Sequence, residues 1–200
     1  IEYYSCIKGL NIDDNKLYFL NGKDYGNEND NSSVIYTEFN THKFLFMGDA
    51  GVEVEVPTKI NRIVVGNTWP LASALSVYLG GADKIVGMHP ASMGAAENGL
   101  LKEVYPEILN AKTDFIKDSQ INIEELLKLN PDVVIGVSKE EAESIRQAGI
   151  PAVTVSVSSW DYDVVQTYDK WNELFDQIFG QSEITQKVSK YSKDALYKKV

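Results

Sequence analysis

The segment Ile121–Gly136, with the sequence INIEELLKLNPDVVIG, constrains the fold more than any other part of the chain. Its helical first half must end before Pro131, because proline cannot continue a helix and disfavours the α conformation of the residue before it. Val133, Val134 and Ile135 follow, and consecutive β-branched residues favour a strand. A helix that leads into a short apolar strand is typical of a parallel sheet covered on both faces.

Short apolar runs alternate with helical patterns over most of the chain. The predicted strands are Arg62–Val65, Lys84–Gly87, Val133–Val137 and Ala152–Val157. The predicted helices are Pro70–Leu79, Asn122–Leu129, Lys139–Gln147, Asp161–Phe179 and Glu183–Val200, with a less regular segment over Ala96–Leu109. We therefore predict an α/β fold, in which a parallel sheet of about four strands is flanked by helices.

Residues 1–50 have a different pattern, in which short β-type runs are separated by clusters of Asn, Asp and Gly. The runs are Lys16–Leu20, Ser33–Phe39 and Lys43–Met47. This pattern predicts an antiparallel β meander, which would form an N-terminal appendage. Asp49 lies in the Gly48–Gly51 segment before the next β-type run, and we interpret it as a turn residue that binds no metal.

The composition excludes several classes of function. A net charge of −10 and the lack of a dense basic cluster argue against nucleic-acid binding. The single cysteine, Cys6, cannot form an internal disulfide, and no apolar run is long enough to span a membrane. The sequence also contains none of the GxSxG, P-loop or HExxH motifs, so no catalytic residues are predicted.

Polar and aromatic residues follow each predicted strand, and parallel strands present these loops at one edge of a sheet. We expect the loops to converge on a ligand site, because binding pockets combine aromatic walls with a few polar groups. The candidate ligand-binding residues are Asn67, Thr68, Trp69, His89, Ser138, Lys139 and Trp160.

Each candidate also has a simpler structural interpretation. Thr68 is an acceptable helix N-cap, and Trp69 either packs on the edge of the core or faces a ligand. His89 is a polar loop residue, a ligand contact or a direct ligand of a metal or haem iron. Lys139 is a solvated charge or a partner for an anionic ligand. Ser158 and Ser159, before Trp160, are possible N-caps.

Several strings together resemble the N-terminal lobe of substrate-binding proteins of ABC importers. They are RIVV, LGGADKIVGM, NIEELLKLNPDVVI and AGIPAVTV, in that order, and the resemblance covers residues 51–200. The most similar group has a rigid helix between its lobes and handles iron-siderophore complexes, haem and cobalamin. The resemblance implies a lobe over residues 51–180, the start of the inter-lobe helix over 181–200, and a second lobe beyond it.

The resemblance also implies how such a protein works. It would be an extracytoplasmic monomer, periplasmic or lipid-anchored at the cell surface, that captures a small-molecule metal chelate, needs no cofactor and performs no chemistry. The loaded protein would dock on an ABC permease in the membrane, and the resembled segment places a docking glutamate at the position of Glu124. The helical phase predicts that Ile123, Leu126 and Leu127 face inward, and Asn122 with Glu125 would form a capping box.

Two alternatives remain. The string ENDNSSVIYTEFNTHKFLFMGDAG resembles the last strands of metallo-β-lactamase-fold hydrolases, including the hydrolase-like domain of DNA-uptake proteins, with Asp49 at a metal-ligand position. The histidine-rich motif of those enzymes is absent, however, and the chain has only His42 and His89. The second alternative is an interaction module without a transport role.

Overall fold

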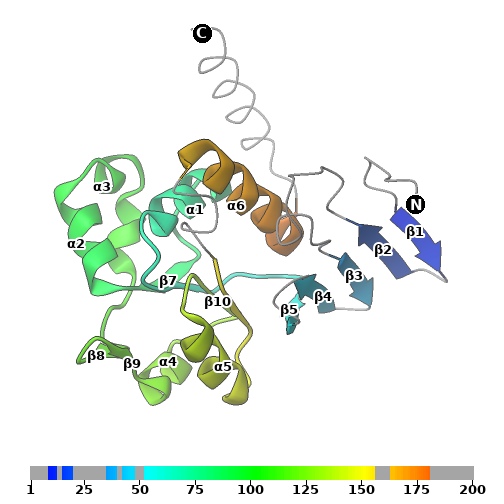
Figure 1. The fold of residues 1–200 in the computed structure, drawn as a ribbon. Coiled ribbons are helices and arrows are strands. Elements are labelled where there is room, and N and C mark those ends of the chain that lie inside the picture. The colour runs from blue at the N-terminus through cyan, green and yellow to red at the C-terminus, as the bar shows by residue number, and fades with distance from the viewer. Residues whose placement is uncertain are drawn as a thin grey trace, which may run out of the picture. The chain divides into compact units, whose positions relative to one another are not determined.

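The computed structural model describes residues 9–12, 15–19, 35–39, 42–47, 52–155 and 163–180 (Figure 1). The chain divides into two compact units, Ile1–Lys59 and Ile60–Val200. Some predictions fall outside the described residues: those on Cys6, Asp49, Ser158, Ser159 and Trp160, and the helix Glu183–Val200.

The first unit contains an antiparallel sheet whose strands pair in chain order. Its strands are β1 (Gly9–Ile12), β2 (Asn15–Phe19), β3 (Ile35–Phe39), β4 (His42–Met47) and β5 (Val52–Pro57). The three predicted strands of this region correspond to β2, β3 and β4, whereas β1 was not predicted. In β5, valine and glutamate alternate, and Val54 and Val56 are buried while Glu55 is exposed, as expected for a strand with one covered face.

The second unit is built on a four-stranded parallel sheet, which confirms the predicted α/β fold. Its strands are β6 (Ile63–Val65), β7 (Ile85–Met88), β10 (Val133–Ile135) and β11 (Ala152–Val153), in the order β11-β10-β6-β7. Three strands are shorter than predicted, and β6 lacks only the first predicted residue, Arg62. β10 ends before Val137 because Gly136 adopts a φ of 83°, which turns the chain out of the sheet, and β11 ends at Val153.

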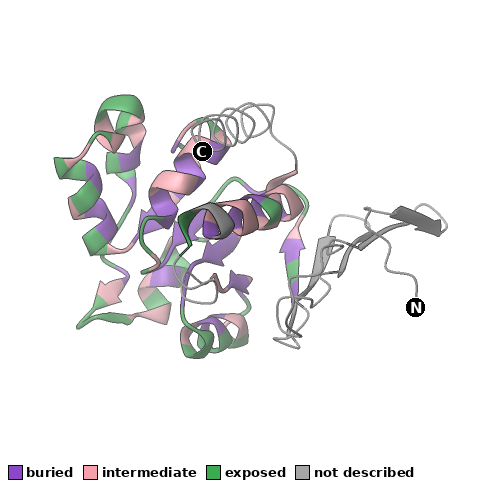
Figure 2. Cartoon of the chain, turned by 45° about the horizontal axis from the view of Figure 1, so that its top comes forward, coloured by how far each residue is buried: buried purple, intermediate pink, exposed green. Residues whose placement is uncertain are grey.

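Helices cover both faces of this sheet. They are α1 (Leu71–Leu79), α2 (Pro90–Asn98), α3 (Leu101–Val104), α4 (Ile123–Lys128), α5 (Lys139–Gln147) and α6 (Val164–Phe179), with a 3-10 helix η2 (Pro106–Asn110) and a hairpin of β8 (Ile116–Lys117) and β9 (Gln120–Ile121). α4 and α5 lie on the opposite side of the sheet from α1 and α6 (Figure 1). Buried residues are concentrated in the strands and on the helix faces turned toward them (Figure 2).

The segment after β7 is more helical than predicted. A helix was expected only from Ala96, but α2 begins at Pro90 directly after the strand. Proline favours the first helical position, because its fixed φ suits the helix and its missing N–H would have no partner there. The His89-Pro90 pair was therefore a usable start signal that the prediction overlooked.

The predicted inward face of α4 needs a correction. Leu126 is fully buried, and Ile123 and Leu129 are partly buried against the same core, but Leu127 is 47% exposed. Leu127 lies about 100° further round the helix than Leu126, which takes it past the margin of the covered face. Leu129, and not Leu127, completes the buried face of α4.

The capping box predicted at Asn122 and Glu125 forms only in half. The Asn122 side chain accepts a hydrogen bond from the Glu125 N–H at 3.0 Å. The Glu125 carboxylate, however, pairs with Lys117 at 3.2 Å and Lys128 at 2.8 Å, and the Asn122 N–H donates instead to the Phe115 carbonyl at 2.8 Å. Glu125 is therefore part of an ion-pair network rather than a reciprocal cap.

α1 and α6 are joined by an aromatic and polar contact around Tyr78. Its ring packs edge-on against Phe175 at a centroid distance of 5.1 Å. Its hydroxyl oxygen lies 2.6 Å from Asp176 Oδ1 and 2.7 Å from the Gly180 carbonyl oxygen. A single hydroxyl proton can be donated to only one of these two acceptors at a time.

Burial raises the pKa of Asp176, and the negative charge of Glu173 adds to this, although the hydrogen bond from Tyr78 opposes it. The native state therefore holds the Asp176 proton more tightly than the unfolded chain. It follows that the contribution of Asp176 to stability is greatest at low pH and is lost as the pH rises through its raised pKa.

We expect Asp176→Asn to remove this pH dependence, because asparagine is neutral at every pH and its amide can donate to the Tyr78 hydroxyl oxygen. The free energy of unfolding at neutral pH should stay equal or rise, and its fall with increasing pH should flatten. Urea denaturation from about pH 4 to pH 8 measures both effects. Glu143→Gln, an exposed change on α5, serves as the control. An unchanged pH profile in Asp176→Asn would contradict the prediction.

Candidate functional site

The loops after β6, β7 and β10 leave the sheet at the same edge and are tied together there by backbone hydrogen bonds. The Gly66 N–H donates to the Ile135 carbonyl at 2.8 Å, and the His89 N–H donates to the Val65 carbonyl at 3.1 Å. The Gly136 N–H donates to the Val153 carbonyl at 2.9 Å. The structure thus brings Asn67, Thr68 and Trp69, His89, and Ser138 with Lys139 to the carboxyl edge of the sheet.

Two glycines, Gly66 and Gly136, allow the loops after β6 and β10 to approach each other closely. A Cβ on Gly66 would lie 2.4 Å from the Gly136 carbonyl oxygen and 2.6 Å from Val137 Cγ1. Gly136 itself has a positive φ, and a Cβ there would lie 2.3 Å from Leu71 Cδ2. Any larger residue at either position would force the loops apart.

Thr68 holds the loops together and does not cap α1. Its hydroxyl donates to the Gly136 carbonyl at 3.0 Å, and α1 begins at Leu71 with no side-chain cap. The interpretation of Thr68 as an N-cap is therefore wrong. The hydroxyl bonds to a carbonyl that is distant in the sequence, and no local sequence pattern predicts such a bond.

Asn67 and Trp69 project from the same loop toward solvent. Asn67 is exposed, and the Trp69 side chain is 65% exposed. The alternative in which Trp69 packs on the edge of the core is therefore wrong. An indole left this open at the carboxyl edge is available to contact another molecule.

His89 caps α2 through one ring nitrogen, which leaves the other as a possible donor. Its Nδ1 accepts a hydrogen bond from the Ala91 N–H at 3.1 Å at the start of α2. In the neutral ring the proton then resides on Nε2, which makes this nitrogen a donor and not a metal ligand. Partial burial lowers the pKa of His89 below its ordinary value, and the negative charge of Glu141 offsets part of this decrease. The neutral donor form is favoured as a result.

Ser138 and Lys139 begin α5. The Ser138 Oγ accepts from the Glu141 N–H at 3.2 Å, and the Glu141 carboxylate accepts from the Ser138 N–H at 2.9 Å, which completes a capping box. The Ser138 hydroxyl keeps its proton for a further bond. Lys139 is exposed and places a positive charge at the same edge.

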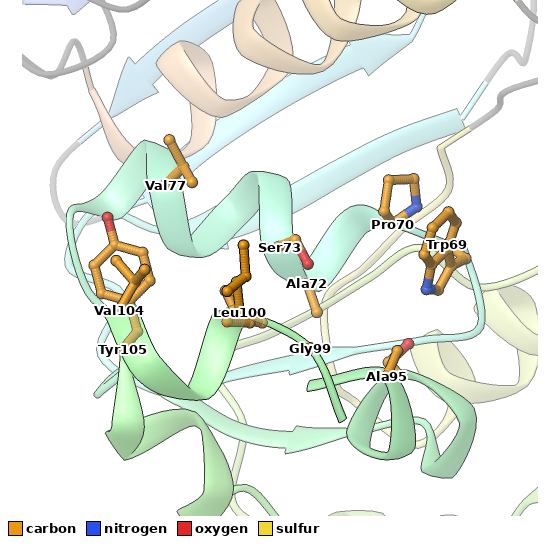
Figure 3. Close-up of a pocket in the computed structure, with 12 residues that line it drawn as sticks. Trp69, Pro70, Ala72, Ser73, Val77, Ala95, Gly99, Leu100, Val104 and Tyr105 are labelled. Carbon is orange, nitrogen blue, oxygen red and sulfur yellow. The ribbon is translucent and has the colours of Figure 1, made fainter. Parts of the chain in front are cut away.

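A pocket of about 370 Å³ lies beside this edge, between α1 and the α2–α3 segment (Figure 3). Among the predicted site residues that the structure describes, Trp69 alone lies in its wall. The residues that sequence reasoning missed are Pro70, Ala72, Ser73 and Val77 on the α1 side, and Ser92, Ala95, Gly99, Leu100, Leu101, Val104 and Tyr105 on the other. Leucine and valine are typical core residues, so no sequence signal marked those of the α2–α3 segment as part of an exposed surface.

The described residues contain no group of three or more His, Cys, Asp or Glu side chains that would hold a metal ion. In the same part of the chain, every helix is too short or too polar to cross a lipid bilayer. The candidate site is therefore an aromatic and polar edge next to an apolar pocket.

Comparison with known protein families identifies the family of this chain. Residues 69–191 match the family model described as periplasmic binding protein, which is more than half of the chain. The chain belongs to the periplasmic binding protein family. This confirms the resemblance noted in the sequence.

Solved structures of periplasmic binding proteins share the fold. A periplasmic solute-binding protein from Veillonella parvula is 29% identical, with a TM-score of 0.65 over 76% of this chain and 46% of the other. The molybdate-binding protein MolA of Haemophilus influenzae is 24% identical (TM-score 0.56, 73% of this chain and 50% of that one). The haem-binding protein HmuT is 20% identical (TM-score 0.51, 71% and 42%).

The chain thus spans half or less of the length of these periplasmic binding proteins. No match was found among curated protein sequences.

Gly66→Ala should destabilise the protein by about 1–3 kcal/mol, because the added methyl group meets the backbone of the neighbouring loop and not a flexible side chain. Gly94→Ala is the matched control, since nothing lies within 4 Å of a Cβ at that position in α2. The control should be neutral or stabilising by up to about 1 kcal/mol through helix propensity. Chemical denaturation of both variants measures the difference, and equal stabilities would contradict the close approach of the two loops.

Proposed function

We propose that this chain is the ligand-capturing lobe of an extracytoplasmic substrate-binding protein that delivers a small molecule to an ABC permease. The family match over residues 69–191 carries the proposal. The parallel sheet supports it, because its carboxyl edge presents side chains suited to recognition and no catalytic constellation. In this proposal the protein is a monomer and performs no chemistry on its ligand.

The groups at the edge favour an anionic, oxygen-rich metal chelate such as an iron-siderophore, haem or a cobalamin-like molecule. Lys139 offers a positive charge, while His89 Nε2 and the Ser138 hydroxyl offer proton donors to ligand oxygens. Trp69 offers a flat aromatic surface, and Asn67, Thr68 and Trp160 complete the proposed set. A chelate brings its metal already coordinated, so it requires no cluster of protein metal ligands.

The proposed organisation follows the family architecture. Residues 51–180 would form the lobe, 181–200 would begin the helix between lobes, and 1–50 would be an appendage. A fragment of a metallo-β-lactamase-fold hydrolase remains the enzymatic alternative. It rests on the sequence around Asp49 alone, and stoichiometric zinc in the purified protein would favour it.

The function can be tested by titrating the chain with haemin, ferrichrome and molybdate while following Trp fluorescence. We expect saturable binding of at least one chelate, with an affinity well below that of a two-lobed protein, because one lobe covers only part of the ligand. Trp69→Ala should weaken binding about tenfold by removing the aromatic wall. Leu127→Ala, on an exposed position of α4, is the control and should change nothing. A lack of saturable binding for both haemin and ferrichrome would contradict the metal-chelate proposal, whether or not molybdate binds.

Glu124 is proposed to dock on the permease. It lies in the first turn of α4 and is exposed, and its carboxylate has no ion-pair partner among the described side chains. A negative charge in this position has only a weak favourable interaction with the helix dipole. Its removal should therefore affect association with a partner more than folding.

Glu124→Ala should change the free energy of unfolding by no more than about 0.5 kcal/mol. In a two-lobed protein that carries this lobe, the same change should reduce permease-coupled uptake while ligand affinity stays constant. Glu143→Ala, an exposed carboxylate in the middle of α5, is the control for general loss of negative charge. Unchanged uptake in Glu124→Ala would remove this residue from the docking surface.

A further inference from the structure

The pocket between α1 and the α2–α3 segment is a groove with a floor of small residues and a rim of large apolar ones. Ala72 and Ser92 form buried parts of the floor. On the rim, Trp69 is 65% exposed, Leu100 is 79% exposed and Val104 is 63% exposed. Small side chains lie between larger ones on the two helical segments, and this makes the surface concave.

The chemistry of the groove is uniform along its length. None of the twelve described lining residues carries a charge, and their polar side-chain groups are the hydroxyls of Ser73, Ser92 and Tyr105 and the indole N–H of Trp69. The walls are therefore suited to an uncharged, mainly apolar group, because their few O–H and N–H donors carry no positive charge that would pair with an anion. The volume of the groove, about 370 Å³, falls within the range of small-molecule pockets.

The groove is continuous with the carboxyl edge of the sheet through Trp69. This residue ends the loop after β6 and also forms one end of the groove, while Val77 and Tyr105 lie toward the other end (Figure 3). A molecule in contact with Trp69 at the edge can therefore extend into the groove along α1. The two regions differ in polarity, with Lys139, Ser138 and His89 at the edge and no charge in the groove.

We infer that the groove receives an apolar alkyl or aryl arm of the transported ligand, whose oxygen-rich chelating head stays at the carboxyl edge. The inference rests on the proposed function and narrows its ligand class to amphiphilic chelates. The arm would cover Leu100 and Val104, and burial of each methylene group would add to affinity. The head would interact with the polar groups in the same way whether or not an arm is present.

Two ferric chelates with the same head and different arms test this directly. The tris-acetohydroxamate and tris-octanohydroxamate complexes of Fe³⁺ present identical iron-binding groups, and only the second has alkyl arms. We expect the octano complex to bind the chain at least about tenfold more tightly than the aceto complex. In Val104→Glu this advantage should disappear while the aceto complex keeps its affinity. Equal affinities for the two complexes in the native chain would overturn the inference.

Matched variants separate the groove from nonspecific hydrophobic binding. Ala95→Trp fills the groove from an exposed position of α2 and should have the same effect as Val104→Glu. Leu127→Glu puts the same charge on an exposed apolar position outside the groove, on α4, and should retain the octano advantage. A loss of the advantage in Leu127→Glu would show binding to apolar surface in general and would overturn the inference.

A neutral probe distinguishes failure of the groove from failure of the proposed function. N-phenyl-1-naphthylamine, which fluoresces in apolar surroundings, should bind saturably to the native chain and about tenfold more weakly to Val104→Glu. Probe binding without binding of any ferric chelate would support the groove and contradict the chelate function. Chelate binding without probe binding would overturn the groove alone. Concentration-dependent dimerisation that is lost in Val104→Glu would also overturn it, since a second copy would then occupy the groove.

Discussion

Parallel pairing of β6 with β10 on one side and β7 on the other is the constraint on which the rest of this lobe depends. Every residue of β6 and β10 is buried, so these strands must be covered by helices on both faces. Parallel connection then sends the chain back across the sheet after each strand and brings the following loops to one edge. The position of the candidate site is thus a consequence of strand direction, and the glycines at positions 66 and 136 set how tightly two of its loops pack.

Several polar groups at the edge have a structural task. The Thr68 hydroxyl joins two loops, the Ser138 oxygen caps α5, and His89 Nδ1 caps α2. These bonds hold the side chains in fixed orientations before any ligand arrives. Such preorganisation reduces the entropy lost on binding, which suits a family whose role is capture and not catalysis.

The polar carboxyl edge and the apolar groove meet at Trp69. This separation of polar from apolar surface is the main physical guide to the class of ligand that we propose. Solved structures of the same fold include proteins described as binding molybdate and haem, which differ greatly in size and polarity. Fold alone therefore does not select a ligand. In this lobe the selection would come from side chains that line the space next to the sheet, with charge and hydrogen bonds for a head group and uncharged walls for an arm.

Local sequence was sufficient to predict the four strands of the parallel sheet and the edge at which their loops meet. The β-branched run Val133–Ile135, the proline before it and the Gly80 stop after α1 act through backbone preferences, which operate within a few residues. The same holds for α5, whose bounds were predicted without error. Tertiary structure alone decided that Leu127 is exposed, that Thr68 bonds to Gly136, and that Leu100 and Val104 form an open rim. These outcomes depend on which surface packs against which, and that arises from contacts between residues far apart in the chain.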